Sequence, residues 1–264
     1  MREIGINICK LNGLDDDAYI DAIASLGFNC IFSGVYDLHR QTAIADRLAR
    51  NGMYYETLHA PFGHINDMWL EGEGGDAMLN ELRDCIDRCT LVSAPIAVVH
   101  MSSGNNAPPI TDIGRGRFTD LFEYAAKKNV RIAVENQRKL ANIAWAMESF
   151  SVSDGVGFCW DCGHEACFTP GREYMPLFGD RLICTHIHDN YGVYNQDDHM
   201  LPFDGKIDFA RFAEHICKSG YTGSFMLEII PEKSGRYADI TPLEFLEKAA
   251  DSVKRLVEMT DMNV

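Results

Sequence analysis

The chain has 264 residues, of which 46% are hydrophobic, so it can bury the core of one large α/β domain. Its formal net charge of -15 repels phosphate backbones, which disfavours nucleic acid as a general partner. No apolar run approaches the roughly 20 residues that span a membrane, and the first residues lack a signal-peptide core. The nine cysteines are scattered through the chain, which is typical of free thiols in a reducing cytoplasm.

Strand-like and helix-like segments alternate along the whole sequence. Short apolar runs predict eight strands, at residues 4–9, 28–32, 53–59, 96–100, 130–135, 156–161, 182–188 and 223–229. The segments between and after them predict eight helices, at residues 15–26, 38–51, 76–92, 117–128, 140–150, 173–178, 209–219 and 242–259. No linker or change in composition interrupts this alternation, so residues 1–264 are predicted to form a single domain.

The alternation of β and α units predicts a parallel sheet, because parallel strands are joined by crossovers that are usually helical. Eight units in roughly 250 residues favour a closed (β/α)8 TIM barrel over an open sheet. Neither G-x-G-x-x-G after the first strand nor G-x-x-x-x-G-K is present, so nucleotide-binding folds lose their main support. The glycine-rich segment 71–75 is expected to form a flexible lid.

Acidic and histidine side chains follow the apolar part of six predicted strands. They are His59, His100, Glu135, Asp161, His186 and Glu228. Because active groups of a TIM barrel lie at the carboxyl ends of its strands, these side chains are predicted to meet at one mouth. Their carboxylates and imidazoles suit Mn²⁺, Mg²⁺, Co²⁺ or Zn²⁺ rather than a thiolate site.

Three further residues stand where they could join this centre. His164 follows Asp161 at a loop spacing that could return it to the mouth, and Asp197-x-His199 offers another pair. Both a second metal ion and contact with substrate oxygens are open interpretations of these residues.

The motifs resemble those of the xylose isomerase-like TIM barrel superfamily, from the first strand to Glu228. The motifs that carry the resemblance are His59-Ala-Pro-Phe, Ile132-Ala-Val-Glu135-Asn136, Trp160-Asp161-Cys-Gly-His164, His186-Ile-His-Asp189-Asn190, Pro202-Phe-Asp-Gly205-Lys-Ile-Asp208-Phe and Met226-Leu-Glu228. The superfamily includes sugar isomerases and epimerases, inosose dehydratase and abasic-site endonucleases.

The resemblance implies a role for each matching residue. Glu135, Asp161, His186 and Glu228 would hold a catalytic divalent metal, and Glu135 and Glu228 would also transfer a proton on opposite faces of the substrate. His186 is preferred to His188 as the ligand because the family's histidine stands three residues before the acidic residue, here Asp189. The remaining substrate contacts are expected from His59, His100, His188 and Asn66.

The expected function is a divalent-metal-dependent isomerase or epimerase of a small sugar, keto-sugar or related polyol. It would act through proton abstraction and a metal-stabilised enediolate. Two alternatives remain open, a lyase of the inosose dehydratase kind and a phosphodiesterase of the abasic-site endonuclease kind. The expected partner is a small-molecule sugar, without nucleic acid or membrane, in the cytoplasm. Barrels of this size often pair, so a homo-oligomer is also considered.

Overall fold

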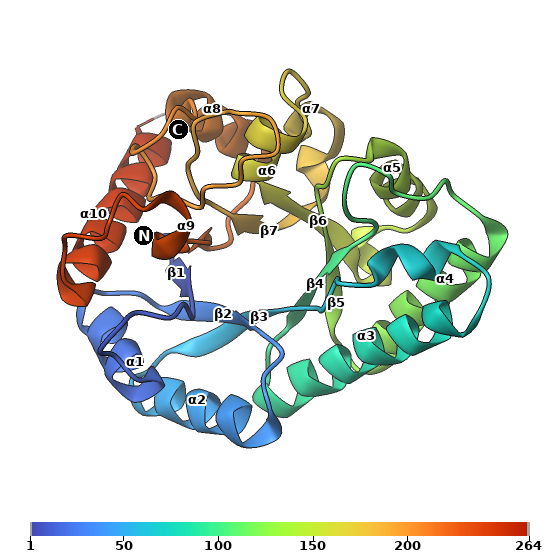
Figure 1. Ribbon diagram of the computed structural model, residues 1–264, viewed down its shortest axis with the longest axis horizontal. Helices are drawn as coiled ribbons and strands as arrows, with labels where there is room; N and C mark the ends of the chain where they lie inside the picture. The colour runs from blue at the N-terminus through green and yellow to red at the C-terminus, as the bar shows by residue number, and fades with distance from the viewer. Residues whose placement is uncertain (1, 263–264) are drawn as a thin grey trace.

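The computed structural model describes residues 2–262, which form an eight-stranded parallel barrel inside a ring of helices (Figure 1). The strands are β1 (Ile4–Asn7), β2 (Cys30–Gly34), β3 (Tyr54–His59), β4 (Ile96–His100), β5 (Arg131–Glu135), β6 (Val156–Asp161), β7 (Leu182–His186) and β8 (Phe225–Leu227). Neighbours follow chain order from β1 to β7, and β8 pairs with β1. A parallel bridge between Ile187 and Leu227 brings β7 and β8 together. The predicted (β/α)8 TIM barrel is confirmed.

The helices cover the outside of the barrel. The longer ones are α1 (Asp16–Ser25), α2 (Leu38–Arg50), α3 (Glu73–Val92), α4 (Asp112–Lys127), α5 (Leu140–Ser149), α8 (Phe209–Ser219) and α10 (Pro242–Asp261). Short helices are α6 (Cys162–Phe168), α7 (Met175–Phe178) and α9 (Pro231–Ser234), with 3₁₀ turns η1 (Ile65–Trp69), η2 (Val152–Asp154) and η3 (Gly179–Arg181). Of the helices in residues 2–262, none is both long and apolar enough to cross a bilayer.

Helix α4 begins at Asp112, earlier than the predicted 117, and α6 and α9 were not predicted. Two glycines, Gly114 and Gly116, lower the helix propensity of the first turns of α4 and hide its start in the sequence. The hydroxyl of Thr111 accepts a hydrogen bond from the backbone N–H of Gly114 and caps the helix. The cap and the packing of the helix on the barrel therefore outweigh the local preference.

Successive side chains of a strand face the outside and the inside of the barrel in turn, so the apolar side chains form two separate regions. Outward-facing residues pack against the helices, as Trp160 shows by stacking on Phe212 of α8 with ring centroids 4.8 Å apart. The inward layer is small, and its members include Cys30, Phe32, Ile96, Val98, Ala133, Cys159, Cys184 and Met226. Because strand side chains alternate, the residues two positions later share this inward face and form the layer above it. The carboxyl ends of the strands thus place His100, Glu135, Asp161, His186 and Glu228 on an apolar floor.

The segment 71–75, expected to be a flexible lid, is instead tied to helix α4. Helix α3 already begins at Glu73. The buried guanidinium of Arg117 in α4 donates hydrogen bonds to the carbonyls of Asp67, Met68, Leu70 and Gly72 and pairs with Asp76. A Cβ at Gly75 would fall 1.9 Å from this guanidinium. The glycine therefore permits close packing here, and the expectation of a lid is wrong.

Candidate active site

The side chain of Glu135, at the end of β5, lies at the centre of the barrel mouth and is fully buried. One carboxylate oxygen lies 2.8 Å from Nδ1 of His186, and the other is 3.2 Å from Nε2 of His59 and in short contact with Nε2 of His100. Strands β3, β4, β5 and β7 thus meet at one carboxylate. Burial by itself raises the pKa of Glu135, but His186 and His100 offset it and hold the pKa well below the usual range.

Glu135 and three residues at the ends of the next strands form a group of potential metal ligands, called the first donor group. Its ligand atoms, from Glu135, Asp161, His186 and Glu228, all lie within 4.8 Å of one another. Within residues 2–262, Oδ2 of Asp161 and Oε2 of Glu228 are buried without a hydrogen bond, although the first lies 3.3 Å from Nδ1 of His164 and the second 3.2 Å from Nδ1 of His186. Buried oxygens that converge without hydrogen bonds are unfavourable unless a cation binds them. These four residues therefore fit a divalent metal that prefers oxygen and nitrogen donors.

The charges of this group are strongly coupled. Burial alone would lower the pKa of His186, but the carboxylates of Glu228 and Glu135 raise it well above its ordinary value. Burial raises the pKa of Glu228, and His186 offsets this and holds it well below its ordinary value. The carboxylates that hold a proton on His186 would equally hold a divalent cation in its place, because both neutralise the same negative charge.

Local structure fixes Asp161 where β6 turns into α6. The Asp161 carboxylate caps α6 by accepting a hydrogen bond of 2.6 Å from the N–H of His164. The amide of Asn136 both donates to the carbonyl of Asp161 and accepts from its N–H, at 2.8 Å each. A Cβ at Gly163 would lie 1.9 Å from the ring of His188, so the Asp-x-Gly-His turn needs glycine there. The Asp-x-Gly-His motif thus contains both the potential metal ligands Asp161 and His164 and the glycine that lets the turn pack against His188.

A second donor group lies beside the first. The ligand atoms of His164, His188, Asp197 and His199 also all lie within 4.8 Å of one another. Nε2 of His199 is 2.6 Å from the Asp197 carboxylate, and the rings of His188 and His199 stack with centroids 4.0 Å apart. His199 has a φ of +46°, an uncommon conformation for a residue with a side chain. Such strain at a cluster of ligands marks a candidate functional position.

Two residues expected to contact substrate lie elsewhere. His188 is fully buried within the second donor group, where its Nε2 is 3.1 Å from Asp161. The side-chain amide of Asn66 donates to the carbonyl of Ser103 and accepts from its N–H, at 2.9 Å each. Asn66 therefore ties the loop after β3 to the loop after β4, and neither Asn66 nor His188 lines the cavity at the mouth.

That cavity has a volume of about 570 Å³, and His59, His100, His164, Asp197, His199 and Glu228 line it. Its wall also includes Phe62 and Arg138, together with Gln137, Phe168 and Lys233, and the sequence did not single out the last three as site residues. The amide of Gln137 lies 3.3 Å from Nε2 of His100 and 3.1 Å from Nδ1 of His164, between the two donor groups. The polar run that follows Glu135 was the available signal for Gln137 and Arg138. Lys233 on the unpredicted α9 had no such signal.

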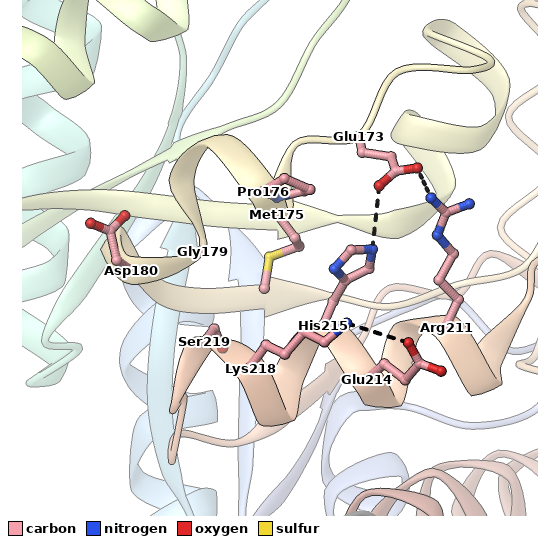
Figure 2. Close-up of a pocket in the computed structure, with 10 residues that line it drawn as sticks. All are labelled: Glu173, Met175, Pro176, Gly179, Asp180, Arg211, Glu214, His215, Lys218 and Ser219. Atoms are coloured by element: carbon pink, nitrogen blue, oxygen red, sulfur yellow. Dashed lines mark ion pairs between the residues drawn. The ribbon is translucent and has the colours of Figure 1, made fainter.

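A second cavity, of about 500 Å³, lies outside the barrel between α7, η3 and α8 (Figure 2). Glu173 forms an ion pair with Arg211 and has an oxygen 3.8 Å from Nε2 of His215, and Lys218 lies 3.5 Å from Glu214. No metal-competent donor group found within residues 2–262 includes a residue of this cavity. The barrel mouth is therefore the candidate active site.

Comparison with curated proteins finds a relative in Sinorhizobium fredii, an uncharacterized protein named y4fM. It is 34% identical over 153 residues, which cover 53% of this chain and 49% of y4fM. The match thus spans about half the length of that relative.

Two solved structures show the same fold over nearly their whole length. A D-tagatose 3-epimerase-like protein superposes with a TM-score of 0.76 at 17% identity, covering 100% of this chain and 99% of the other. An L-ribulose 3-epimerase gives a TM-score of 0.76 at 15% identity, with coverages of 100% and 97%. A family model described as xylose isomerase-like TIM barrel matches residues 20–260. The chain therefore belongs to the xylose isomerase-like TIM barrel family.

Proposed function

We propose that this protein is a divalent-metal-dependent isomerase or epimerase of a small sugar, keto-sugar or related polyol. One observation carries the proposal: the buried donors of Glu135, Asp161, His186 and Glu228 converge beside a cavity of about 570 Å³. That size suits a small organic ligand. The names of the two structural neighbours as 3-epimerases, or as similar to one, support the same reaction class.

The metal would be held by the first donor group, whose oxygen and nitrogen atoms suit Mn²⁺, Mg²⁺, Co²⁺ or Zn²⁺. A bound divalent cation supplies Lewis acidity, which polarises a substrate carbonyl and makes the neighbouring C–H more acidic. His59 and His100 lie in the cavity wall and contact Glu135, so they would orient both this carboxylate and the substrate hydroxyls.

The two carboxylates assigned to proton transfer have different surroundings. Glu228 lines the cavity, and its pKa is held low by His186, so its carboxylate is ready to take a proton from the carbon beside the carbonyl. The electrons of the broken C–H bond would then form an enediolate. Return of a proton to the opposite face of the same carbon gives the epimer, and return to the neighbouring carbon gives the isomer. Glu135, with His59 and His100 as proton sources, is the proposed second carrier.

The test combines metal analysis with proton exchange. Protein purified without chelator should contain about one Mn, Co or Mg per chain. It should exchange the C–H proton of a ketose with D₂O, as followed by NMR. Chelation should abolish the exchange, and adding Mn²⁺ should restore it. Absence of bound metal after reconstitution, together with absence of exchange across a panel of ketopentoses and ketohexoses, would reject the proposal.

The second donor group favours one alternative, a phosphodiesterase. His164, His188, Asp197 and His199 could hold another ion, and multinuclear sites stabilise both oxygens of an in-line phosphoryl displacement. Two or three zinc ions per chain, with the additional zinc lost in His199→Ala, and cleavage of duplex DNA with an abasic site would support it. The net charge of -15 opposes binding to DNA.

A lyase shares the proton abstraction but expels a hydroxyl group. Mass spectrometry of the product separates the two, because loss of water changes the mass and isomerisation leaves it unchanged. The action of residues 1–264 as one domain, the cytoplasmic location and pairing into a homo-oligomer stay predictions.

A further inference from the structure

Arg138 lines the cavity at the mouth, three residues after Glu135, and its guanidinium is held from two other segments. The centre of the guanidinium lies 3.4 Å from the ring centroid of Phe168, the last residue of α6. Its Nε donates a hydrogen bond of 3.0 Å to the side-chain oxygen of Asn195, in the loop after β7. The stacking and this hydrogen bond fix the plane of the guanidinium, which presents its N–H groups as a planar fork. They leave its terminal nitrogens for another partner.

No acidic side chain within residues 2–262 forms an ion pair with Arg138, and its terminal nitrogens donate no hydrogen bond there. This is notable in a chain with 39 acidic residues against 24 lysines and arginines. The other cation of the cavity wall, Lys233, is already engaged, because its Nζ lies 2.9 Å from the Asp197 carboxylate. Arg138 is thus the positively charged side chain of this cavity wall that is held in position but forms no ion pair within residues 2–262.

Partial burial disfavours the charged guanidinium and lowers the pKa of Arg138, although the charge of Asp197 acts in the opposite direction, and the guanidinium nevertheless stays protonated. Asp197 and Glu228 face the same cavity, but His199 and Lys233 contact the first and His186 contacts the second. The fork is therefore better matched to an incoming carboxylate or phosphate, which accepts two parallel hydrogen bonds from it.

We propose that the site takes an anionic sugar, in which a terminal carboxylate or phosphate binds Arg138 while the other end reaches the first donor group. This inference rests on the proposed isomerase or epimerase function and specifies its substrate class. Arg138 and Glu228, a member of the first donor group, line the same cavity, which supports such a span. A neutral ketose would leave the guanidinium without its bidentate partner.

The experiment measures binding by calorimetry to the metal-loaded protein. The probes are D-ribulose and D-xylulose, their 5-phosphates, and the related ketouronates in which the terminal carbon is a carboxylate. We expect one anionic series to bind about ten- to a hundredfold more tightly than the neutral ketoses, the range of a bidentate charged hydrogen bond. Preference for the 5-phosphates identifies phosphate as the anion, and preference for the ketouronates identifies carboxylate.

Variants separate the local site from overall charge. Arg138→Gln should abolish the preference, and Arg138→Lys, which keeps the charge but loses the planar fork, should retain part of it. Arg131→Gln is the matched control, because it removes the same charge from the exposed start of β5, at the opposite end of the strand, and should leave the preference intact. Thermal melting checks that all three variants are folded.

Equal affinity for neutral and anionic sugars, no binding of either anionic series, or a full preference in Arg138→Gln would overturn the anion site. Its failure is distinguishable from failure of the proposed function. Arg138-dependent binding of anionic sugars without proton exchange in D₂O would keep the anion site and reject the isomerase. Exchange on neutral ketoses, unaffected by Arg138→Gln, would do the reverse.

Discussion

Two cavities of this protein, one at the barrel mouth and one outside the barrel, have similar volumes, but their charged groups are satisfied in different ways. Around the outer cavity, Glu173 pairs with Arg211 and Glu214 with Lys218, and these partly exposed side chains remain in contact with water (Figure 2). At the barrel mouth, carboxylates and imidazoles are buried, and oxygens of Asp161 and Glu228 have no hydrogen-bond partner within residues 2–262.

The difference shows which property of a polar cluster indicates a ligand. Exposed ion pairs form readily on any surface and contribute little to stability, so the ion pairs of the outer cavity do not indicate an occupant. Buried carboxylate oxygens that converge without hydrogen bonds are unfavourable by several kcal/mol in order of magnitude. Such an arrangement persists where a cation or substrate compensates it, which directs attention to the mouth.

The largest expected effect comes from matched substitutions in the two cavities. Glu228→Gln keeps the shape of the side chain but removes the proposed proton acceptor, so proton exchange should fall by about 10²- to 10⁴-fold. Glu173→Gln makes the same chemical change in the outer cavity and should leave the exchange rate unchanged. Exchange rates followed by NMR check both variants. Full activity in Glu228→Gln would contradict the role of this residue.

Glu56 provides a further comparison with the carboxylates of the mouth. Its carboxyl group is also buried, but the side chains that donate hydrogen bonds to it are neutral. It accepts hydrogen bonds from Ser224 and Cys30, and burial raises its pKa above the ordinary 4.5 despite them. The folded state therefore binds the proton more tightly than the unfolded state. The stability from this group is complete below pH 4.5 and is lost as the pH rises through the raised pKa.

Glu56→Gln should consequently be more stable than wild type at pH 7, by on the order of 1 kcal/mol, with the gap closing below pH 4.5. Urea unfolding across this pH range measures it. The exposed Glu81→Gln serves as the control and should show no such gap. A Glu56→Gln variant less stable than wild type at neutral pH would show that the ionised carboxylate is favourable there.

The smallest effect is expected at the outer cavity. Burial lowers the pKa of His215, and the charges of Arg211 and Lys218 lower it further, so the folded state disfavours the protonated ring. Stability from this group is present above pH 6.5 and is lost as the pH falls through this value toward the lowered pKa.

Because His215 is partly solvated, the loss between pH 7.5 and 5.5 should be a few tenths of a kcal/mol. Comparison of wild type with His215→Gln by urea unfolding measures it, and the exposed His39→Gln is the control. An acid-induced loss as large in His215→Gln as in wild type would assign the effect to other groups.

Much of the fold could be predicted because it follows from local periodicity. Eight apolar runs with helices between them specify a parallel barrel, and the carboxyl ends of six strands are visible as the points where the apolar run meets an acidic or histidine residue. Six residues of the mouth were identified in this way, since alternation along a strand tells which residues share its inward face. The choice of Glu135, Asp161, His186 and Glu228 among them as metal ligands came from the family resemblance.

Only the tertiary structure decided which groups meet across distant loops. The pairing of Asn66 with Ser103, the clamp of Arg117 on segment 71–75 and the joining of His188 with Asp197 and His199 depend on loop paths that local sequence leaves open. The amino-acid sequence by itself determined the strands, the barrel and the residues at its mouth, because these follow from hydrophobic periodicity. The two donor groups described above, and the position of the Arg138 guanidinium without an ion pair in residues 2–262, arise from long-range packing that no periodicity encodes.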